Sequence, residues 1–368
     1  MNILVTGSNG FIARNLLALL ERNESYRVFK SDRNTTIDEL SSMLSEADVV
    51  VHLAGENRPS DPSAFKKINT DLTGFIVQQL EKRKTPYNLL YASSTQAALQ
   101  NPYGTSKKEA EDIINTDVKN GQAVIFRFPG VFGKWCKPNY NSVVATYCYN
   151  VAHDLPVEVR DENYALKIVY IDDVVNSLIE FCGDKPVAGR IINADVEPVY
   201  EISLGKLAQT LSKFKTNRSS FYLPEVGEPL EKKLYSTYLT YLPENEFDYT
   251  PLVRTDERGY LFELLKTTTS GQIFVSSTKP GITRGNHFHH TKTEKFCVVS
   301  GEGLIQFRKI ETGEVIEYRV SGSDPKIVDI PPGYTHNISN TGNTDMITLF
   351  WANEIFDPSR PDTYFEKV

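Results

Sequence analysis

The first twenty residues, "MNILVTGSNGFIARNLLALL" (1–20), contain a short apolar run, a glycine turn and a stretch with apolar residues at helical spacing. The run at 2–5 is typical of a buried strand, and the stretch at 11–20 predicts a helix. Between them, Gly7 and Gly10 let the backbone approach a pyrophosphate, which the positive end of a helix dipole also favours. Ala13, at the third small position, still permits close packing of helix on strand. The stretch therefore predicts a dinucleotide-binding turn.

Further strand and helix patterns alternate through the amino-terminal two-thirds of the chain. Apolar runs at 47–55 and 87–96 flank the helical stretch 65–84. This alternation predicts an α/β fold with a doubly wound parallel sheet that binds its cofactor at the carboxyl ends of the strands. The residues expected to bind the cofactor are Gly7, Asn9, Gly10, Phe11, Ile12, Ser31, Asp32, Arg33, Leu53, Ala54, Gly55, Tyr103 and Lys107.

The second strand, "YRVFKSD" (26–32), ends in charged residues that bear on the choice of cofactor. An acidic side chain such as Asp32 usually holds the adenosine ribose, whereas an arginine such as Arg33 accommodates a 2′-phosphate. Together Lys30 and Arg33 favour NADPH over NADH. The alternative is that they are solvated loop charges.

The stretch "NPYGTSKKEAEDII" (101–114) places Tyr103 and Lys107 one helical turn apart. A nearby ammonium stabilises the phenolate and should lower the pKa of Tyr103 from about 10. Tyr103 would then be a proton donor to an alkoxide formed by hydride addition. A hydroxyl from "SSTQ" (93–96) would polarise the carbonyl. A tyrosine–lysine pair is common on surface helices, so the glycine turn and the strand end supply the context for this interpretation.

Residues 1 to about 243 resemble an extended short-chain dehydrogenase/reductase that acts on nucleotide sugars. The matching segments are "TGSNGFIA", "HLAG", "SSTQ", "YGTSK", "RFPGVFG" and "VYIDDV". The resemblance implies a catalytic set of Ser94, Tyr103 and Lys107. It also makes Arg127, Asn141 and Arg160 candidate substrate-binding residues, with arginine suited to phosphate.

From about residue 247 the pattern changes to short β-branched and aromatic runs separated by Gly, Pro, Asn and Ser. This spacing predicts an antiparallel sandwich or barrel. The polar, proline-marked segment 241–253 is a plausible linker. We therefore expect two domains, 1–243 and 244–368, the second of them all-β.

This second domain contains "ITRGNHFHHTKTEKFCVVSG" (282–301) and "PPGYTHNISN" (331–340). Alternate residues of a strand face the same side, so His287 and His289 should point inward together. Glu294 and His336 would reach the same cavity from neighbouring strands. Three imidazoles and a carboxylate suit Zn²⁺, Fe²⁺, Mn²⁺ or Ni²⁺. A bulge would make His290 the ligand in place of His289.

The two segments resemble the two-part signature of cupins, jelly-roll barrels that bind metals. They also resemble the dTDP-4-keto-6-deoxyhexose epimerases, cupin-fold enzymes that work without metal and use the first of these histidines, here His287, as a base. A metal-bound imidazole cannot remove a proton. With metal present, the base would be one of Tyr260, Lys266, His290 and Tyr334.

Composition limits the classes of partner. A net charge of −7 and the lack of a basic stripe argue against nucleic acid, and no apolar segment approaches membrane-spanning length. The four cysteines show no paired spacing and the amino terminus shows no signal peptide. We expect a cytoplasmic protein.

Both halves suit one functional group, since a sugar ketone acidifies the neighbouring carbon and can also be reduced. The whole chain resembles bifunctional capsular polysaccharide enzymes. That resemblance implies C3 epimerisation of a UDP-2-acetamido-2,6-dideoxy-4-ketohexose, NADPH-dependent C4 reduction to the L-talose product, bound Zn²⁺ and a homodimer. The alternatives are a reductase with a structural or dimerising cupin, a regulator that senses NADPH, and an epimerase or dehydratase that retains NAD.

Overall fold

A computed structural model describes residues 1–368, which fold into two compact units. The first unit contains Met1–Ser212 and Lys233–Pro243, and the second contains Lys213–Lys232 and Glu244–Val368. The segment Lys213–Lys232 joins the second unit because Phe221 and Leu223 exchange backbone hydrogen bonds of 2.7 and 2.8 Å with Lys266. A strand pattern does not reveal such a pairing. None of the helices has the length and apolarity needed to span a bilayer.

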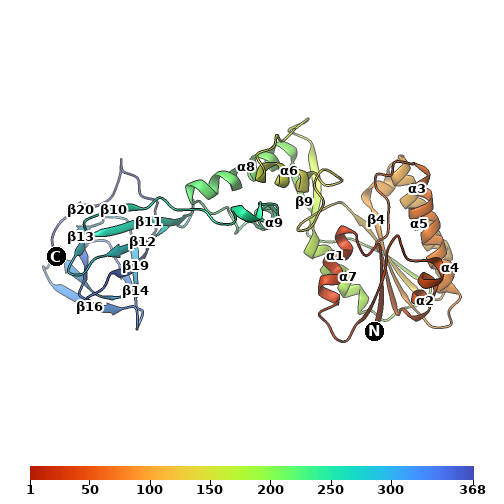
Figure 1. Cartoon of the computed structure of the whole chain (residues 1–368), viewed down its shortest axis with the longest axis horizontal. Coiled ribbons are helices and arrows are strands. Elements are labelled where there is room, and N and C mark those ends of the chain that lie inside the picture. Colours follow the sequence, from red (N-terminus) through yellow and green to blue (C-terminus); the bar gives the residue numbers. More distant parts are fainter. The chain divides into compact units, whose positions relative to one another are not determined.

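The first unit is built on a six-stranded parallel sheet, in which β4 is labelled in Figure 1. The strand order is β2-β1-β3-β4-β5-β8. The order reverses direction between β1 and β3, which is where doubly wound sheets bind ligands. The α/β fold expected from the sequence is therefore confirmed. The strands are β1 (Asn2–Thr6), β2 (Arg27–Ser31), β3 (Val49–His52), β4 (Asn88–Ser94), β5 (Gln122–Phe128) and β8 (Arg190–Ala194). A small second sheet contains β6 (Gly130–Phe132), β7 (Ala165–Tyr170) and β9 (Tyr200–Ser203).

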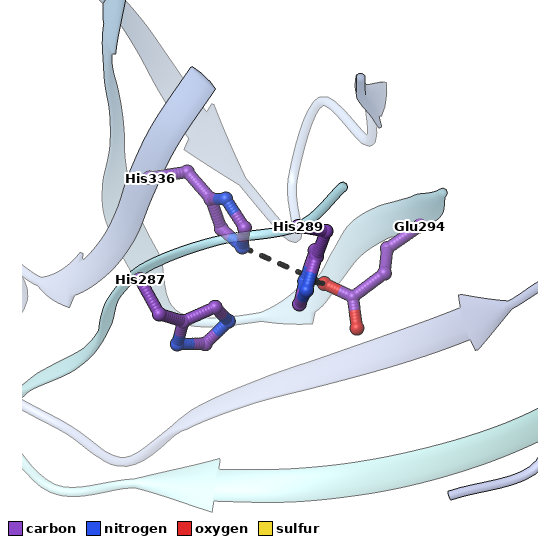
Figure 2. Close-up of side chains that lie close together, drawn as sticks. All are labelled: His287, His289, Glu294 and His336. Carbon is purple, nitrogen blue, oxygen red and sulfur yellow. Dashed lines mark hydrogen bonds and ion pairs between the residues drawn. The ribbon is translucent and has the colours of Figure 1, made fainter. Parts of the chain in front are cut away.

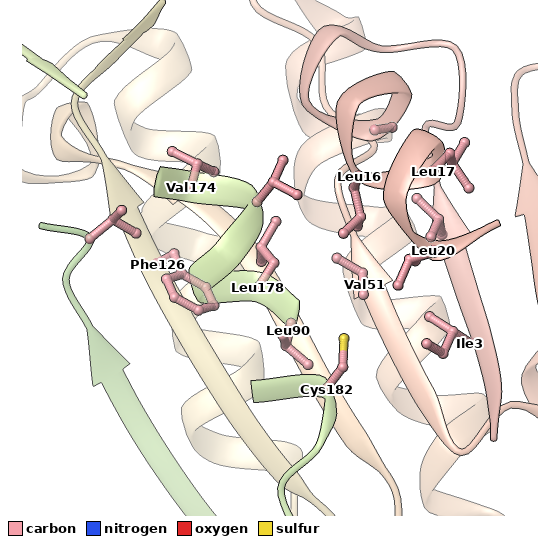
Figure 3. Close-up of a cluster of buried hydrophobic side chains, with 14 of the residues drawn as sticks. Ile3, Leu16, Leu17, Leu20, Val51, Leu90, Phe126, Val174, Leu178 and Cys182 are labelled. Carbon is pink, nitrogen blue, oxygen red and sulfur yellow. The ribbon is translucent and has the colours of Figure 1, made fainter. Parts of the chain in front are cut away.

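Helices cover both faces of the parallel sheet. The helices of residues 1–243 are α1 (Phe11–Leu20), α2 (Ile37–Glu46), α3 (Ser63–Phe65), the π-helix η1 (Lys66–Asp71), α4 (Leu72–Glu81), the 3-10 helix η2 (Thr95–Ala98), α5 (Pro102–Asp117), α6 (Val143–Ala152), α7 (Ile171–Cys182), α8 (Leu204–Ser220) and α9 (Pro229–Leu239). The apolar sides of α1 and α7 pack on one face, as Figure 3 shows. Those of α2, α4 and α5 pack on the other face.

Within the second unit, residues 244–368 form two antiparallel sheets, which confirms the all-β fold expected for them. One has the order β10-β11-β12-β19-β14-β17 and the other β16-β15-β18-β13-β20. The elements are η3 (Glu244–Glu246), β10 (Arg254–Asp256), β11 (Gly259–Lys266), β12 (Gln272–Thr278), β13 (Thr283–Phe288), β14 (Glu294–Ser300), β15 (Glu302–Lys309), β16 (Val315–Ser321), β17 (Ile327–Ile330), β18 (Tyr334–Asn340), β19 (Met346–Ala352) and β20 (Tyr364–Phe365).

Strand β19 lies in the middle of its sheet, paired with β12 on one side and β14 on the other. Its buried residues alternate along the strand, and Met346 and Phe350 contribute to one apolar cluster. Phe296 of β14 and Ile338 of β18 belong to the same cluster, so it joins residues of both sheets. Outside this apolar cluster, β13, β14 and β18 carry the polar side chains His287, Glu294 and His336.

We predict that Leu16→Ala destabilises the first unit because Leu16 of α1 is fully buried in the core between α1 and the parallel sheet. Loss of a core leucine should lower the free energy of unfolding by about 2–5 kcal/mol. Urea unfolding followed by far-ultraviolet circular dichroism measures the change. Leu19→Ala, in the same helix at 41% exposure, is the matched control and should change the free energy far less. Equal effects of the two substitutions would contradict the packing described here.

Candidate functional site

The glycine turn after β1 forms a close-packed cradle at the sheet's carboxyl edge. Gly7 has a φ of 64°, and a side chain there would meet the Ala54 backbone at 2.7 Å. The Gly10 amide donates to the Gly7 carbonyl at 2.8 Å, and no side chain caps the amino terminus of α1. Glycine at position 7 therefore brings two strand ends together, and α1 presents free amides beside them. These features fit the pyrophosphate of a dinucleotide.

At the end of β2, Asp32 and Arg33 occupy different surroundings. One Asp32 carboxylate oxygen accepts a 2.8 Å hydrogen bond from the Asn9 amide side chain, and the other accepts from the Asn34 backbone. Asp32 thus ties the glycine turn to the second strand. The guanidinium of Arg33 lies 3.0 Å from Glu56 with its side chain 85% exposed, while the Lys30 ammonium pairs with Glu21. Of these two cations, only Arg33 is held near the end of β3, by its ion pair with Glu56.

A buried hydrogen-bond chain that sequence reasoning missed supports the same edge. The Thr73 hydroxyl donates to the Asn69 carbonyl, so it accepts from His52 Nε2 at 3.0 Å. His52 Nδ1 then accepts from the Thr6 hydroxyl at 2.7 Å. Burial, aided by Lys107, lowers the pKa of His52 to about 3 and keeps the ring neutral. The neutral His52 ring therefore links Thr6 of β1 to Thr73 of α4.

The structure brings Ser94 and Tyr103 together. Asn101 caps α5 by accepting from the Gly104 amide at 2.8 Å. A side chain on Gly104 would meet the Gln96 carbonyl at 2.2 Å, so the first turn of α5 packs directly on η2. This packing places Tyr103 beside Ser94 at the end of β4. Burial raises the pKa of Tyr103, and a hydrogen bond with Ser94 opposes the rise.

Lys107, one helical turn after Tyr103 in α5, is almost fully buried. Its ammonium donates to the Ala92 carbonyl at 2.8 Å and lies 4.9 Å from the centre of the Tyr91 ring. Burial lowers the pKa of Lys107 to about 8, while Glu111 pulls it upward. The sequence argument expected Lys107 to lower the pKa of Tyr103. That expectation is wrong for this structure, where desolvation of the phenol outweighs the hydrogen bond with Ser94 and raises the pKa of Tyr103.

A second feature that sequence reasoning missed is Asn69 on the π-helix η1. Its side-chain oxygen accepts from the Glu56 amide at 2.8 Å, and its amide donates to the Ser106 hydroxyl at 2.9 Å. A side chain on Gly55 would meet the Lys107 ammonium at 3.1 Å and the Asn69 oxygen at 3.3 Å. Asn69 thus fixes the loop after β3 against the helix that carries Lys107. A π-helical turn could have flagged it, but the sequence shows only ordinary helical spacing.

The three predicted substrate-binding residues lie apart in the chain and differ in their contacts. Arg127, in β5, donates from Nε and Nη2 to both oxygens of Glu111 at 2.8 and 2.5 Å. Ser93 donates to the same carboxylate at 2.5 Å. Asn141 precedes α6 and Arg160 precedes β7, and both are exposed. Arg127 is therefore already committed to a buried carboxylate, whereas Asn141 and Arg160 face solvent.

In the second unit, His287, His289, Glu294 and His336 converge, with their ligand atoms all within 4.8 Å of one another (Figure 2). His287 pairs directly with His336 across β13 and β18, and their rings lie 4.6 Å apart. His289 follows the end of β13 and is 1% exposed. By contrast, His290 is exposed and packs on Tyr364. The geometry places His289 and not His290 in the cluster.

The hydrogen bonds around this cluster leave nitrogen lone pairs facing its centre. His289 Nδ1 donates to the Asp362 carbonyl at 2.6 Å, which leaves Nε2, 3.3 Å from the Glu294 carboxylate, as the nitrogen that can ligate a cation. His336 Nε2 is buried, lies 3.5 Å from Glu294 and makes no hydrogen bond. An unpartnered buried nitrogen beside a carboxylate and two further imidazoles fits a divalent metal with nitrogen and oxygen ligands.

Electrostatics in the cluster favour the ligand forms. Burial alone would raise the pKa of Glu294, but the adjacent imidazoles of His289 and His336 outweigh it and lower the pKa to about 2. Burial, with contributions from the other two imidazoles, lowers the pKa of His287 to about 4. Glu294 is thus a carboxylate and His287 a neutral imidazole near neutral pH. Both are the forms that bind a cation.

A cavity of about 210 Å³ opens beside Glu294. The Gln272 side-chain oxygen in its wall is buried and makes no hydrogen bond. Of the candidates for the base, Lys266 pairs with Glu263 at 2.7 Å, and the Tyr334 ring packs on Phe307. The cavity is lined by Arg254, Leu261, Glu263, Gln272, Phe274, Lys292, Glu294, Ala352, Glu354 and Phe356. None of the four candidates for the base is among these residues.

Known proteins match both units. Residues 3–194 match the sequence profile described as the NAD dependent epimerase/dehydratase family. The chain belongs to this family. Its members' nicotinamide cofactor accords with the glycine cradle after β1. Residues 254–364 match the profile described as the Polysaccharide biosynthesis C-terminal domain, so the epimerase/dehydratase fold is here joined to a second known domain.

Two relatives match this epimerase/dehydratase family member along its whole length. An enzyme of Pseudomonas aeruginosa named UDP-2-acetamido-2,6-beta-L-arabino-hexul-4-ose reductase is 42% identical and covers 99% of this chain and 98% of its own. A crystal structure of the capsular polysaccharide assembling protein CapF from Staphylococcus aureus is 44% identical, with a TM-score of 0.91 and full coverage of both chains. UDP-glucuronic acid 4-epimerase from Bacillus cereus, at 19% identity and a TM-score of 0.54, covers 66% of this chain and 98% of its own and shares the fold.

We predict that Glu111→Gln makes the first unit less stable at pH 7 by about 1–3 kcal/mol, because Arg127 and Ser93 lose a charged acceptor. Burial alone would raise the pKa of Glu111, but Arg127 and Ser93 outweigh it and lower the pKa below its ordinary value of 4.5. A lowered folded-state pKa stabilises the protein above that value, and the contribution is lost as pH falls through the folded pKa.

The stability difference should therefore be largest at neutral pH and shrink below pH 4.5. Urea unfolding across a pH series measures it. Glu46→Gln removes the exposed ion pair with Arg27 and is the control, with an expected effect of at most about 1 kcal/mol. A Glu111 effect that is independent of pH would contradict the assignment.

Proposed function

We propose that the chain is a bifunctional nucleotide-sugar enzyme. Residues 244–368 epimerise C3 of a UDP-2-acetamido-2,6-dideoxy-4-ketohexose, and residues 1–243 then reduce the C4 ketone with NADPH. The product is UDP-2-acetamido-2,6-dideoxy-L-talose, a precursor of N-acetyl-L-fucosamine in capsular polysaccharide. The full-length match to the Pseudomonas aeruginosa reductase carries the proposal, because it spans both units.

In the reductase, NADPH supplies hydride to C4 when bound. The phenol of Tyr103 gives its proton to the resulting alkoxide, and the Ser94 hydroxyl polarises the ketone oxygen beforehand. The raised pKa of Tyr103 keeps the phenol protonated at neutral pH, so the phenol can donate a proton. With a pKa of about 8, Lys107 is mostly cationic at neutral pH and stabilises the phenolate once the proton has left.

The cofactor assignments follow the glycine cradle and the ends of the first strands. Gly7, Gly10 and the amino terminus of α1 would hold the pyrophosphate, and the exposed guanidinium of Arg33 would meet the 2′-phosphate of NADPH. Asn141 and Arg160, both exposed, would contact the UDP-sugar. Arg127 can join them only by sharing its guanidinium with Glu111.

In the epimerase, the cluster of His287, His289, Glu294 and His336 would hold Zn²⁺, which would polarise the ketone and stabilise the enolate. The cavity beside Glu294 would admit the sugar, with the free oxygen of Gln272 available to a hydroxyl or amide donor. With His287 bound to metal, the proton must leave C3 to another base. Lys292, which lines the cavity, joins Tyr260, Lys266, His290 and Tyr334 as a candidate. A cytoplasmic homodimer completes the proposal, and sedimentation equilibrium tests the assembly.

A reductase with a structural or dimerising second unit is the competing function. The name of the Pseudomonas aeruginosa relative specifies reductase activity alone. The two functions differ in one observable, since only an epimerase exchanges the C3 proton with solvent. NMR of the keto-sugar in D₂O, first without and then with NADPH, separates them.

We predict that Tyr103→Phe lowers the rate of NADPH oxidation by about 100-fold or more, because the alkoxide loses its proton donor. Deuterium incorporation at C3 should remain at the wild-type rate, since it takes place in the other unit. Absorbance at 340 nm follows NADPH and NMR follows deuterium. Tyr164→Phe, at an exposed tyrosine of the same unit, is the control. Normal NADPH turnover by Tyr103→Phe would refute the reductase assignment.

We predict the reverse pattern for Glu294→Gln. Loss of the buried carboxylate should abolish deuterium incorporation and reduce the zinc content measured by elemental analysis, while NADPH oxidation with a ready-made C3 epimer persists. Glu302→Gln, an exposed carboxylate of the same unit, should leave both properties unchanged. Full zinc content in Glu294→Gln would remove this residue from the ligand set. Deuterium incorporation that persists without zinc would favour a base acting alone.

A further inference from the structure

Asp362 binds the segment that connects the second and third members of the His/Glu cluster. One carboxylate oxygen accepts from the His290 amide at 3.0 Å. The other accepts from the Thr291 amide at 2.9 Å, the Thr291 hydroxyl at 3.0 Å and the Lys292 amide at 2.8 Å. A single carboxylate thus gathers three consecutive backbone amides, an arrangement that fixes the path of the chain between His289 and Glu294.

The backbone of the same residue fixes the His289 ring itself. The Asp362 carbonyl accepts a 2.6 Å hydrogen bond from His289 Nδ1. That bond places the hydrogen on Nδ1 and leaves the Nε2 lone pair directed toward Glu294. Asp362 therefore holds both the ring orientation and the tautomer of His289 while lying 68 residues or more after His289, His287 and Glu294 in the chain.

The residues around Asp362 are anchored on both sides. Before and after it, the Pro361 carbonyl and the Thr363 hydroxyl each accept from the Lys292 ammonium at 3.0 Å. Asp362 has a φ of 36°, in the left-handed region, which aspartate tolerates better than most residues. Because the residue is not glycine, this conformation is strained. The hydrogen bonds of the Asp362 carboxylate hold the backbone in it.

Further along, β20 pairs with β13, and Phe365 lies opposite His287. The Glu366 amide donates to the Asn286 carbonyl at 3.0 Å, and the Glu366 carboxylate pairs with Arg308 at 2.5 Å. Residues 361–366 therefore form a strap that contacts both sides of the histidine-bearing segment.

We propose that Asp362 is a positioning residue for metal binding, one that holds His289 in its ligand orientation and tautomer through the strap 361–366. The inference rests on the proposed metal site and deepens it. Asp362 touches neither substrate nor metal in this role. It removes the need to order the ligand loop when the ion binds, so its loss should weaken metal affinity more than it weakens the fold.

The experiment measures zinc affinity of the full chain by competition with a chromophoric chelator. Asp362→Ala should weaken binding by about 10- to 100-fold, as for other residues that orient metal ligands. Asp362→Asn keeps one acceptor oxygen and should give an intermediate affinity. Asp357→Ala is the matched control, because the Asp357 carboxylate contacts only Ser359 and Arg360 within its own turn. It should bind zinc as the wild type does.

Two further measurements separate positioning from a general loss of structure. The visible absorption spectrum of the Co²⁺-loaded protein reports ligand geometry, and it should change in Asp362→Ala but not in Asp357→Ala. If Asp362→Ala does not fold, Thr291→Val replaces it in the experiment, because it removes only one hydrogen bond to the carboxylate. It should weaken zinc binding by about 2- to 10-fold.

The outcomes distinguish the two levels of the proposal. If the wild type takes up no zinc, the metal site is wrong and the role of Asp362 is wrong with it. If the wild type binds zinc and Asp362→Ala and Thr291→Val bind it as tightly, the site stands and the positioning role is refuted. Weaker binding with an altered Co²⁺ spectrum in Asp362→Ala supports the role. Weaker binding by Asp357→Ala to the same degree overturns it.

Discussion

Burying charge in a protein is unfavourable unless the charge is paired, and this constraint organises both units. Lys107 is buried among a backbone carbonyl, the face of Tyr91 and the more distant Glu111. Glu294 is buried among imidazoles. The residues around each buried charge must supply dipoles or opposite charges in place of water. In each unit, the residues that do so make up the candidate site.

The two clusters meet the demand differently. Around Lys107 the compensation is partial: one hydrogen bond to the Ala92 carbonyl connects α5 to β4, and burial still lowers the pKa of Lys107 to about 8. Around Glu294 the imidazoles stabilise the carboxylate, but the buried Nε2 of His336 makes no hydrogen bond. The contacts of Lys107 hold its ammonium in place, whereas the unpartnered nitrogen of His336 is available to an added cation. The contrast supports assigning proton chemistry to the first unit and a metal to the second.

Local patterns predicted those parts of the structure that local forces decide. The turn at Gly7, the helix that carries Tyr103 and Lys107 and the convergence of His287 with His336 follow from strand and helix periodicity and from motifs. Contacts between distant segments were not predictable. Asn69 acts through a π-helical turn, Asp362 reaches the ligand loop from far along the chain, and Lys213–Lys232 joins the second unit through Lys266. The direction of the Tyr103 pKa shift was missed because desolvation depends on packing that no motif encodes.

The central place of β19 has a consequence for how the second unit is made. Strands β12 and β14 are synthesised about 50 to 70 residues before the strand that pairs with both of them. Until Met346–Ala352 emerges from the ribosome, each exposes an unsatisfied edge and an apolar face. The unpaired edges of β12 and β14 are the places at which a partly synthesised chain could pair with another copy before β19 covers them.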